Sequence, residues 1–213
     1  MTEGMADITP ELVKRLRDMT GAGMMDCKRA LQDADGDLAE AVDLLRQKGL
    51  ASAANRAGRT ANQGRIESYI HFNNTVGSLV EVNCETDFVA NTEDFKQLAK
   101  DIALHVASPS APLFVRREEV PADLVDAERH IYEVQAKELG KPDNVIPNIV
   151  EGKMKAFYEQ TVLLEQKFVK DDSKTIQDLL DEVSAKVGEK VAVRRLVRYK
   201  LGEETDREGP VRA

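Results

Sequence analysis

The chain has 213 residues, of which 42% are hydrophobic and 32% charged, enough to build the core of one medium domain and a smaller one. Its formal net charge of -8 argues against nucleic-acid binding, because such proteins usually offer a basic face to phosphates. No apolar run is long enough to span a bilayer, and the start lacks the basic and apolar segments of a signal peptide. We therefore expect a cytoplasmic protein that binds neither nucleic acid nor membranes.

Three short helices are predicted at the beginning of the chain. The first begins at Thr9, an N-cap residue followed by proline, and places Met19 on its apolar face. We expect Asp26 to cap the second helix, and we expect the third to open at Asp37 and to end at Gly49. Together these segments predict a compact bundle.

A β-hairpin with one buried face is predicted next, because apolar and polar residues alternate on both sides of an Asn73-Asn74 turn. The apolar residues of this pattern are Ile66, Ile70, Phe72, Val76, Val80 and Val82. A helix at 92–106 should pack on the resulting sheet, and a strand at 191–201 should complete it.

Charged helical segments at 122–139 and 148–160 are suited to an antiparallel hairpin, and a further helix is predicted at 174–187. The order of elements indicates an α+β fold, in which a three-helix bundle precedes a small antiparallel sheet packed with helices and a helical hairpin.

The predicted domains follow from this order of elements. They are a three-helix domain at 1–49, a linker at 50–64, an α+β core at 65–202 and a charged tail at 203–213 that we expect to be disordered.

Signatures of catalysis are absent from the sequence, which contains no P-loop pattern, no H-E-x-x-H and no dinucleotide fingerprint. Cys84 and His105 form the least implausible nucleophilic pair, but nothing in the sequence specifies that they approach each other. Cys27 and Cys84 lie far apart and are expected to be free thiols. We therefore predict no enzyme activity, no direct binding of nucleotides, no metal and no cofactor.

The connection after the hairpin is the most informative segment. Strand alternation stops at Asp87 and Phe88, which places a carboxylate beside a large aromatic side chain on a loop held by a buried strand. One interpretation is that this pair protrudes and acts on a partner. The alternative is that Phe88 turns inward to cover the sheet while Asp87 caps the next helix.

Two segments resemble signature segments of the elongation factor Ts family, in the family's order and separation. They are residues 16–31, LRDMTGAGMMDCKRAL, and residues 81–91, EVNCETDFVAN. Residues 101–107, DIALHVA, and 187–189, VGE, are also similar, so that the resemblance covers about residues 6–202.

This resemblance implies binding to elongation factor Tu carrying GDP and the promotion of GDP release and GTP exchange. It implies that the segment Thr86-Asp87-Phe88-Val89 enters near the partner's magnesium site, displaces the magnesium and disturbs the phosphate site. The other residues that it suggests for partner contact are Arg17, Met24, Met25, Lys28 and His105. For His105 and for the methionines, packing inside the fold is the alternative.

The sequence holds one copy of the core unit where longer family members hold two, so the resemblance also implies a homodimer. A non-catalytic protein-binding adaptor remains the alternative function, because the three-helix domain is also similar to ubiquitin-associated bundles. The intact segment from Thr86 to Val89 favours nucleotide exchange over the adaptor, which would leave Asp87 and Phe88 without a role.

Overall fold

The computed structural model describes residues 8–20 and 22–203, apart from the side chains of 50–55 and 57. It divides into two units. Unit 1 takes in the chain up to Gly64 together with 83–95 and 179–192, and unit 2 takes in 65–82, 96–178 and the chain from Val193 onward.

The predicted α+β class is confirmed. No described helix has the length and apolar character that a membrane crossing requires. Except for Glu203, the predicted disordered tail lies outside the described residues.

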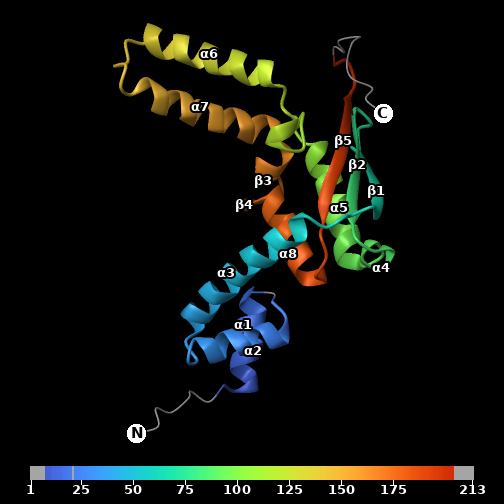
Figure 1. Ribbon diagram of the computed structural model, residues 1–213. Coiled ribbons are helices and arrows are strands. Elements are labelled where there is room, and N and C mark those ends of the chain that lie inside the picture. The colour runs from blue at the N-terminus through green and yellow to red at the C-terminus, as the bar shows by residue number, and fades with distance from the viewer. Residues whose placement is uncertain (1–7, 21, 204–213) are drawn as a thin grey trace. The chain divides into compact units, whose positions relative to one another are not determined.

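Three helices open the chain, as predicted (Figure 1). They are α1 (Pro10–Thr20), α2 (Met24–Asp33) and α3 (Leu38–Ala57). The hydroxyl of Thr9 accepts a hydrogen bond from Leu12 N at 3.3 Å. The Asp37 carboxylate accepts bonds from Ala39 N at 2.7 Å and Glu40 N at 2.9 Å. Both predicted N-caps therefore satisfy backbone donors that have no partner within their helix.

Two helix boundaries differ from the prediction. Asp26 does not cap α2, because the N-cap is Gly23 and Asp26 lies within the first turn, where it pairs with Lys48 at 2.6 Å. Helix α3 does not end at Gly49 but continues to Ala57. The segment after Gly49 is rich in alanine, the residue with the highest helix propensity, and this outweighs one internal glycine.

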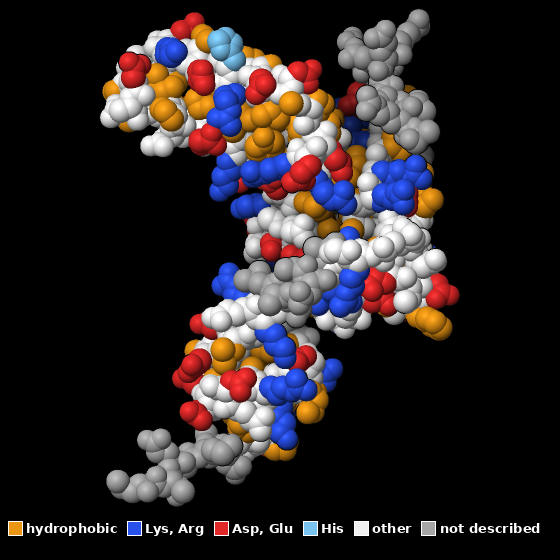
Figure 2. All heavy atoms as spheres, viewed as in Figure 1, with side chains coloured by type: hydrophobic (Ala, Val, Ile, Leu, Met, Phe, Trp, Pro, Cys, Tyr) orange, Lys and Arg blue, Asp and Glu red, His pale blue; other side chains and the backbone are white. Residues whose placement is uncertain are grey.

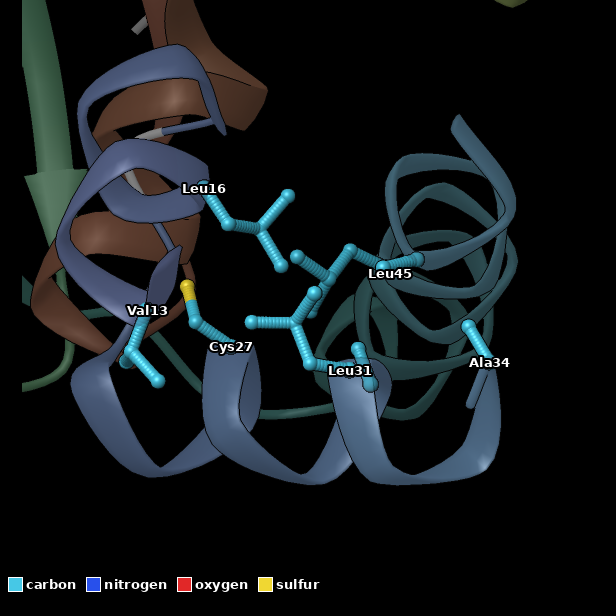
Figure 3. Close-up of a cluster of buried hydrophobic side chains, with 8 residues drawn as sticks. Val13, Leu16, Cys27, Leu31, Ala34 and Leu45 are labelled. Carbon is cyan, nitrogen blue, oxygen red and sulfur yellow. The ribbon is translucent and has the colours of Figure 1, made fainter. Parts of the chain in front are cut away.

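The bundle encloses its own hydrophobic cluster (Figure 3). Leu16 from α1 and Leu31 from α2 are fully buried, and Leu45 from α3 lies against them. Met19 was predicted to join this cluster, but its side chain is 59% exposed. It lies in the last turn of α1, beyond the part of that helix whose residues are buried.

A three-stranded sheet is formed in the order β1-β2-β5. Its strands are β1 (Gln63–Ile70), β2 (Val76–Cys84) and β5 (Ala192–Lys200). The inner face carries Val80 and Val82, both buried. Helix α5 (Glu93–Val106) is attached to this face, because the Ser78 hydroxyl donates to Ala103 O at 2.6 Å. The predicted sheet and its covering helix are thus present.

The apolar side chains of β1 lie on the wrong face for the predicted hairpin core. Ile66 and Ile70 are exposed, and Phe72, just beyond the strand, is 88% exposed. The nearest atom to a Cβ built on Gly77 would be Ile70 Cδ1, which places Ile70 against the outer face of β2. We call the exposed apolar residues of the three strands, together with Leu201 just after β5, the outer face; they are Ile66, Ile70, Leu79, Val197, Tyr199 and Leu201.

The remaining elements complete the fold. Helices α6 (Ala122–Glu138) and α7 (Ile146–Thr161) form the predicted antiparallel hairpin, seen in yellow and orange in Figure 1. Helix α8 (Ile176–Val187) starts two residues later than predicted, because Lys174 and Thr175 belong to a strand. The sequence did not predict the short helix α4 (Asp87–Ala90) or the paired strands β3 (Lys167–Phe168) and β4 (Asp171–Thr175).

Candidate partner-binding site

Residues 86–89, which we call the tip, follow directly from the central strand. Thr86 is the N-cap of α4 and its hydroxyl accepts a hydrogen bond from Val89 N at 3.4 Å. Asp87 and Phe88 are the first two residues of this single-turn helix, and both are exposed, the Phe88 ring to 83%. Figure 2 shows hydrophobic surface at this end of unit 1. Phe88 therefore does not turn inward, and Asp87 does not cap the next predicted helix, α5, where the Thr92 hydroxyl accepts from Phe95 N at 3.3 Å.

Buried or bonded residues support the tip on both sides. Cys84 at the end of β2 and Ala90 at the end of α4 are buried. The Asn91 side chain donates to Asp87 O at 2.9 Å, and the Thr92 hydroxyl donates to Val89 O at 2.8 Å. The backbone that carries Asp87 and Phe88 is thus bonded to neighbouring residues while the two side chains face solvent.

Two glutamates form the base of the tip, and sequence reasoning missed them as functional residues. The Glu189 carboxylate accepts three hydrogen bonds, from Glu85 N, Thr86 N and the Thr86 hydroxyl. Glu85 in turn accepts from Lys190 N at 2.7 Å. This bond, with the Arg59 guanidinium, lowers the pKa of Glu85. The local sequence pattern does not predict such contacts, because Glu85 and Glu189 are 104 positions apart.

A second exposed group lies where α1 ends and α2 begins. Arg17, Met24, Met25 and Lys28 are all exposed, as partner contact requires. The structure adds Met19, which the sequence pattern had placed in the core. In Figure 2, Lys and Arg side chains share this part of unit 1 with hydrophobic ones. Methionines adapt their shape readily, so such a patch suits a protein surface better than a small ligand.

His105 differs from the other predicted contact residues because its side chain has 0% exposure. Its Nδ1 accepts from Val169 N at 3.2 Å, so the proton is on Nε2, which donates to Gln166 Oε1 at 2.9 Å. Desolvation by burial lowers the pKa of His105, against the opposing effect of the Gln166 bond. These contacts, all within unit 2, favour the core interpretation over partner contact.

Gln166 is a further residue that the sequence did not single out. Its side-chain amide donates to Ser110 O at 3.1 Å and to Gln160 O at 2.7 Å while its oxygen binds His105. The buried pair of His105 and Gln166 therefore joins α5 to the loop after it and to the end of α7.

The postulated nucleophilic pair finds no support in the hydrogen bonds. Burial raises the pKa of the Cys84 thiol to about 11, and the thiol donates to Thr86 O at 3.1 Å. A thiol with this pKa stays protonated near neutral pH and is a poor nucleophile. Both ring nitrogens of His105 are bonded to other residues. Within the described residues, no group of three or more His, Cys, Asp and Glu side chains could hold a metal ion.

Comparison with known proteins finds similarity over most of the chain. The family model described as Elongation factor TS matches residues 11–203. The chain is 54% identical over 199 residues to Elongation factor Ts of Desulforamulus reducens, covering 93% of this chain and 91% of that protein. It is 52% identical over 197 residues to Elongation factor Ts of Fervidobacterium nodosum, covering 92% of this chain and 100% of that protein. Elongation factor Ts of Geobacter metallireducens is 54% identical over 196 residues.

Proposed function

Because the chain belongs to the elongation factor Ts family and is therefore a translation elongation factor, we propose that it binds elongation factor Tu carrying GDP and promotes exchange of GDP for GTP. The observation that carries this proposal is the exposed pair of Asp87 and Phe88 on a firmly held support. Such a role places the protein in the cytoplasm and requires no covalent chemistry of its own.

The proposed mechanism assigns different tasks to the two tip residues. Phe88 inserts between side chains of the partner, and full burial of such a ring contributes roughly 1.5 to 3 kcal/mol. The Asp87 carboxylate enters near the bound magnesium, displaces it and disturbs the hydrogen bonds around the phosphates. By linkage, a factor that binds the nucleotide-free partner more tightly weakens nucleotide binding in the same proportion. Thr86 and Val89 hold the turn that presents the pair.

The exposed group on the three-helix bundle supplies the second part of the proposed contact. Arg17 and Lys28 offer positive charge and Met24 and Met25 offer adaptable apolar surface, to which we add Met19. Contact at a second site raises the affinity for the partner without requiring the tip to bind tightly. His105 is left out of this surface because it is buried.

The outer face supports the proposal that the chain forms a homodimer. Five apolar side chains from the three strands and Leu201 just after β5 are exposed there, and monomeric proteins rarely expose apolar patches of this kind. A second copy offers the same apolar surface and could cover it by a symmetric contact. We therefore propose that the sheets of two copies meet at their outer faces.

The test of the exchange function is the release rate of a fluorescent GDP from elongation factor Tu, measured at increasing concentrations of the parent chain and of Phe88→Ala. We expect strong acceleration by the parent and a maximal rate lower by at least about tenfold, ~1.4 kcal/mol, for the variant. Leu139→Ala is the matched control, because Leu139 is exposed but lies on the helical hairpin. A well-folded parent that leaves the release rate unchanged would rule out exchange and favour the adaptor.

A further inference from the structure

The Glu189 carboxylate is shared among three donors, all in the segment that enters the tip. Its Oε2 accepts from Glu85 N at 3.1 Å and from Thr86 N at 3.0 Å, and its Oε1 accepts from the Thr86 hydroxyl at 2.7 Å. Hydrogen bonds to an ionised acceptor are stronger than those between neutral groups. One side chain therefore fixes both the backbone and the hydroxyl of Thr86.

The Thr86 hydroxyl connects this carboxylate to the exposed pair. Because its proton is donated to Glu189, its oxygen is free to accept from Val89 N and so to cap α4. A helix of one turn has almost no stability of its own, and α4 has only four residues. The conformation of Asp87 and Phe88 thus depends on contacts made from outside that helix.

A reciprocal set of contacts holds Glu189 in place. Lys190 N donates to Glu85 Oε1, and the Lys190 ammonium donates to Arg59 O at 2.9 Å. The Arg59 guanidinium binds Glu85 at 3.3 Å, while the Ser184 hydroxyl donates to Glu189 O at 2.6 Å. The segment after α8 and the linker after α3 are therefore both bonded to the base of the tip.

From these contacts we propose that Glu189 is a positioning residue for nucleotide exchange: it holds Thr86 so that α4 presents Asp87 and Phe88 to the partner. The proposal rests on the proposed exchange function. Glu189 itself touches neither nucleotide nor magnesium. Its removal should lower the maximal rate of GDP release and leave the affinity for the partner, set by the bundle and other contacts, largely intact.

The first test compares the parent with Glu189→Gln in the GDP release assay. An amide offers only one acceptor oxygen to three donors, so we expect the maximal rate to fall about tenfold, ~1.4 kcal/mol. The concentration of factor that gives half of the maximal rate should change less than about twofold. Glu119→Gln is the matched control, because that carboxylate also accepts from a backbone donor, Val115 N at 2.9 Å, but in unit 2.

A combined variant separates positioning from general loosening of the fold. If Glu189 acts through the exposed pair, then Glu189→Gln should change the rate less than about twofold when Asp87→Ala and Phe88→Ala are both already present. The proposal is overturned if Glu189→Gln lowers the rate of GDP release equally with and without the changes at the exposed pair. It is also overturned if Glu189→Gln alone leaves that rate unchanged.

Amide hydrogen exchange gives a readout that does not depend on the partner. In Glu189→Gln the amides of Glu85 and Thr86 should exchange at least about tenfold faster, while amides in α6 and α7 keep their rates. If the parent fails to release GDP, the exchange function fails on its own, and faster exchange at these two amides still supports Glu189 as the residue that fixes the tip. Unchanged exchange there overturns the proposal.

Discussion

The side chain of Phe88 is available for binding, whereas two side chains near it are buried in the fold. Cys84 and Ala90 are buried and belong to the fold, whereas the Phe88 ring lies in solvent. Its apolar surface has not been used to stabilise the native state, so the free energy of burying it is available when a partner covers it. This is why Phe88→Ala is expected to lower exchange activity with almost no change in thermal stability.

The buried His105 predicts a dependence of stability on pH. Its pKa is lowered in the folded state, so below about pH 6.5, its usual value, the unfolded chain binds a proton that the folded chain does not. The stabilisation that neutral His105 gives to the folded state is complete above that pH. It is lost as the pH falls toward the pKa of His105 in the folded state, by at most ~1.4 kcal/mol per pH unit. Chemical denaturation at pH 7.5 and 5.5 measures it.

His105→Gln isolates this effect from the other titrating groups. Glutamine can keep a hydrogen bond to Gln166 but cannot gain a proton, so the variant should lose less stability than the parent between the two pH values. An equal loss in both proteins would show that His105 does not carry the pH dependence.

The sequence marked the tip as a candidate site but left the orientation of Phe88 open. The break in alternation at Asp87 indicated a connection between a strand and a helix, but whether Phe88 points outward depends on how its backbone is held. In the structure that backbone is bonded to Glu189, whose position beside Thr86 is a product of the folded chain and could not be predicted from the local sequence pattern. His105 was ambiguous for the same reason, because its partners Gln166 and Val169 come from another part of the chain.

Among the elements, α3 offers a direct test of helix continuity. A Cβ built on Gly49 meets nothing within 4 Å, and the residue lies inside the helix. Gly49→Ala should therefore raise the free energy of unfolding by about 0.5 to 1 kcal/mol, because alanine loses less conformational freedom. Had the helix ended at Gly49 with a left-handed glycine, the same change would be destabilising. Urea denaturation distinguishes the two.

The comparison variant for this experiment is Gly140→Ala, placed where α6 has ended. Gly140 has a φ of +65°, a conformation that alanine adopts only with strain. We expect this variant to be less stable than the parent by roughly 1 kcal/mol. We therefore expect the free energy of unfolding to rise in Gly49→Ala and to fall in Gly140→Ala.

The outer face shows what strand alternation can and cannot predict. The period of two in β1 and β2 was real, and it correctly predicted two strands with distinct faces. It could not say which face of β1 would meet α5, because each strand of a hairpin has two faces and both faces of this sheet carry apolar residues. The assignment of Ile66 and Ile70 to the core failed for that reason.

For the whole molecule, the proposed pairing of two copies can be tested by a charge on the outer face. Tyr199→Lys places an ammonium group among exposed apolar side chains, where a second copy would bury it without a partner. The dissociation constant measured by analytical ultracentrifugation should rise about a hundredfold, ~2.8 kcal/mol. Leu113→Lys, on an exposed loop outside the outer face, should leave it unchanged. A parent chain that sediments as a monomer at all concentrations would refute the pairing.

For the whole molecule, the most informative parts of the sequence were two long segments that resemble the signature segments of a family in order and separation. Residues 16–31 and 81–91 were enough to suggest the family, and the fold class followed from the order of helices and strands. The long-range contacts among Arg59, Glu85 and Lys190 were not predictable, since each involves residues that only the complete fold brings together.

The helical hairpin of α6 and α7 has a practical use. It closes over buried side chains of its own, among them Val150, Met154 and Phe157, and the loop between its helices is exposed around Lys141 and Asp143. Insertions at exposed loop tips are usually tolerated, so this loop can accept a fluorophore or an affinity tag. A label attached there would let binding to the partner be followed with the tip and the outer face left unmodified.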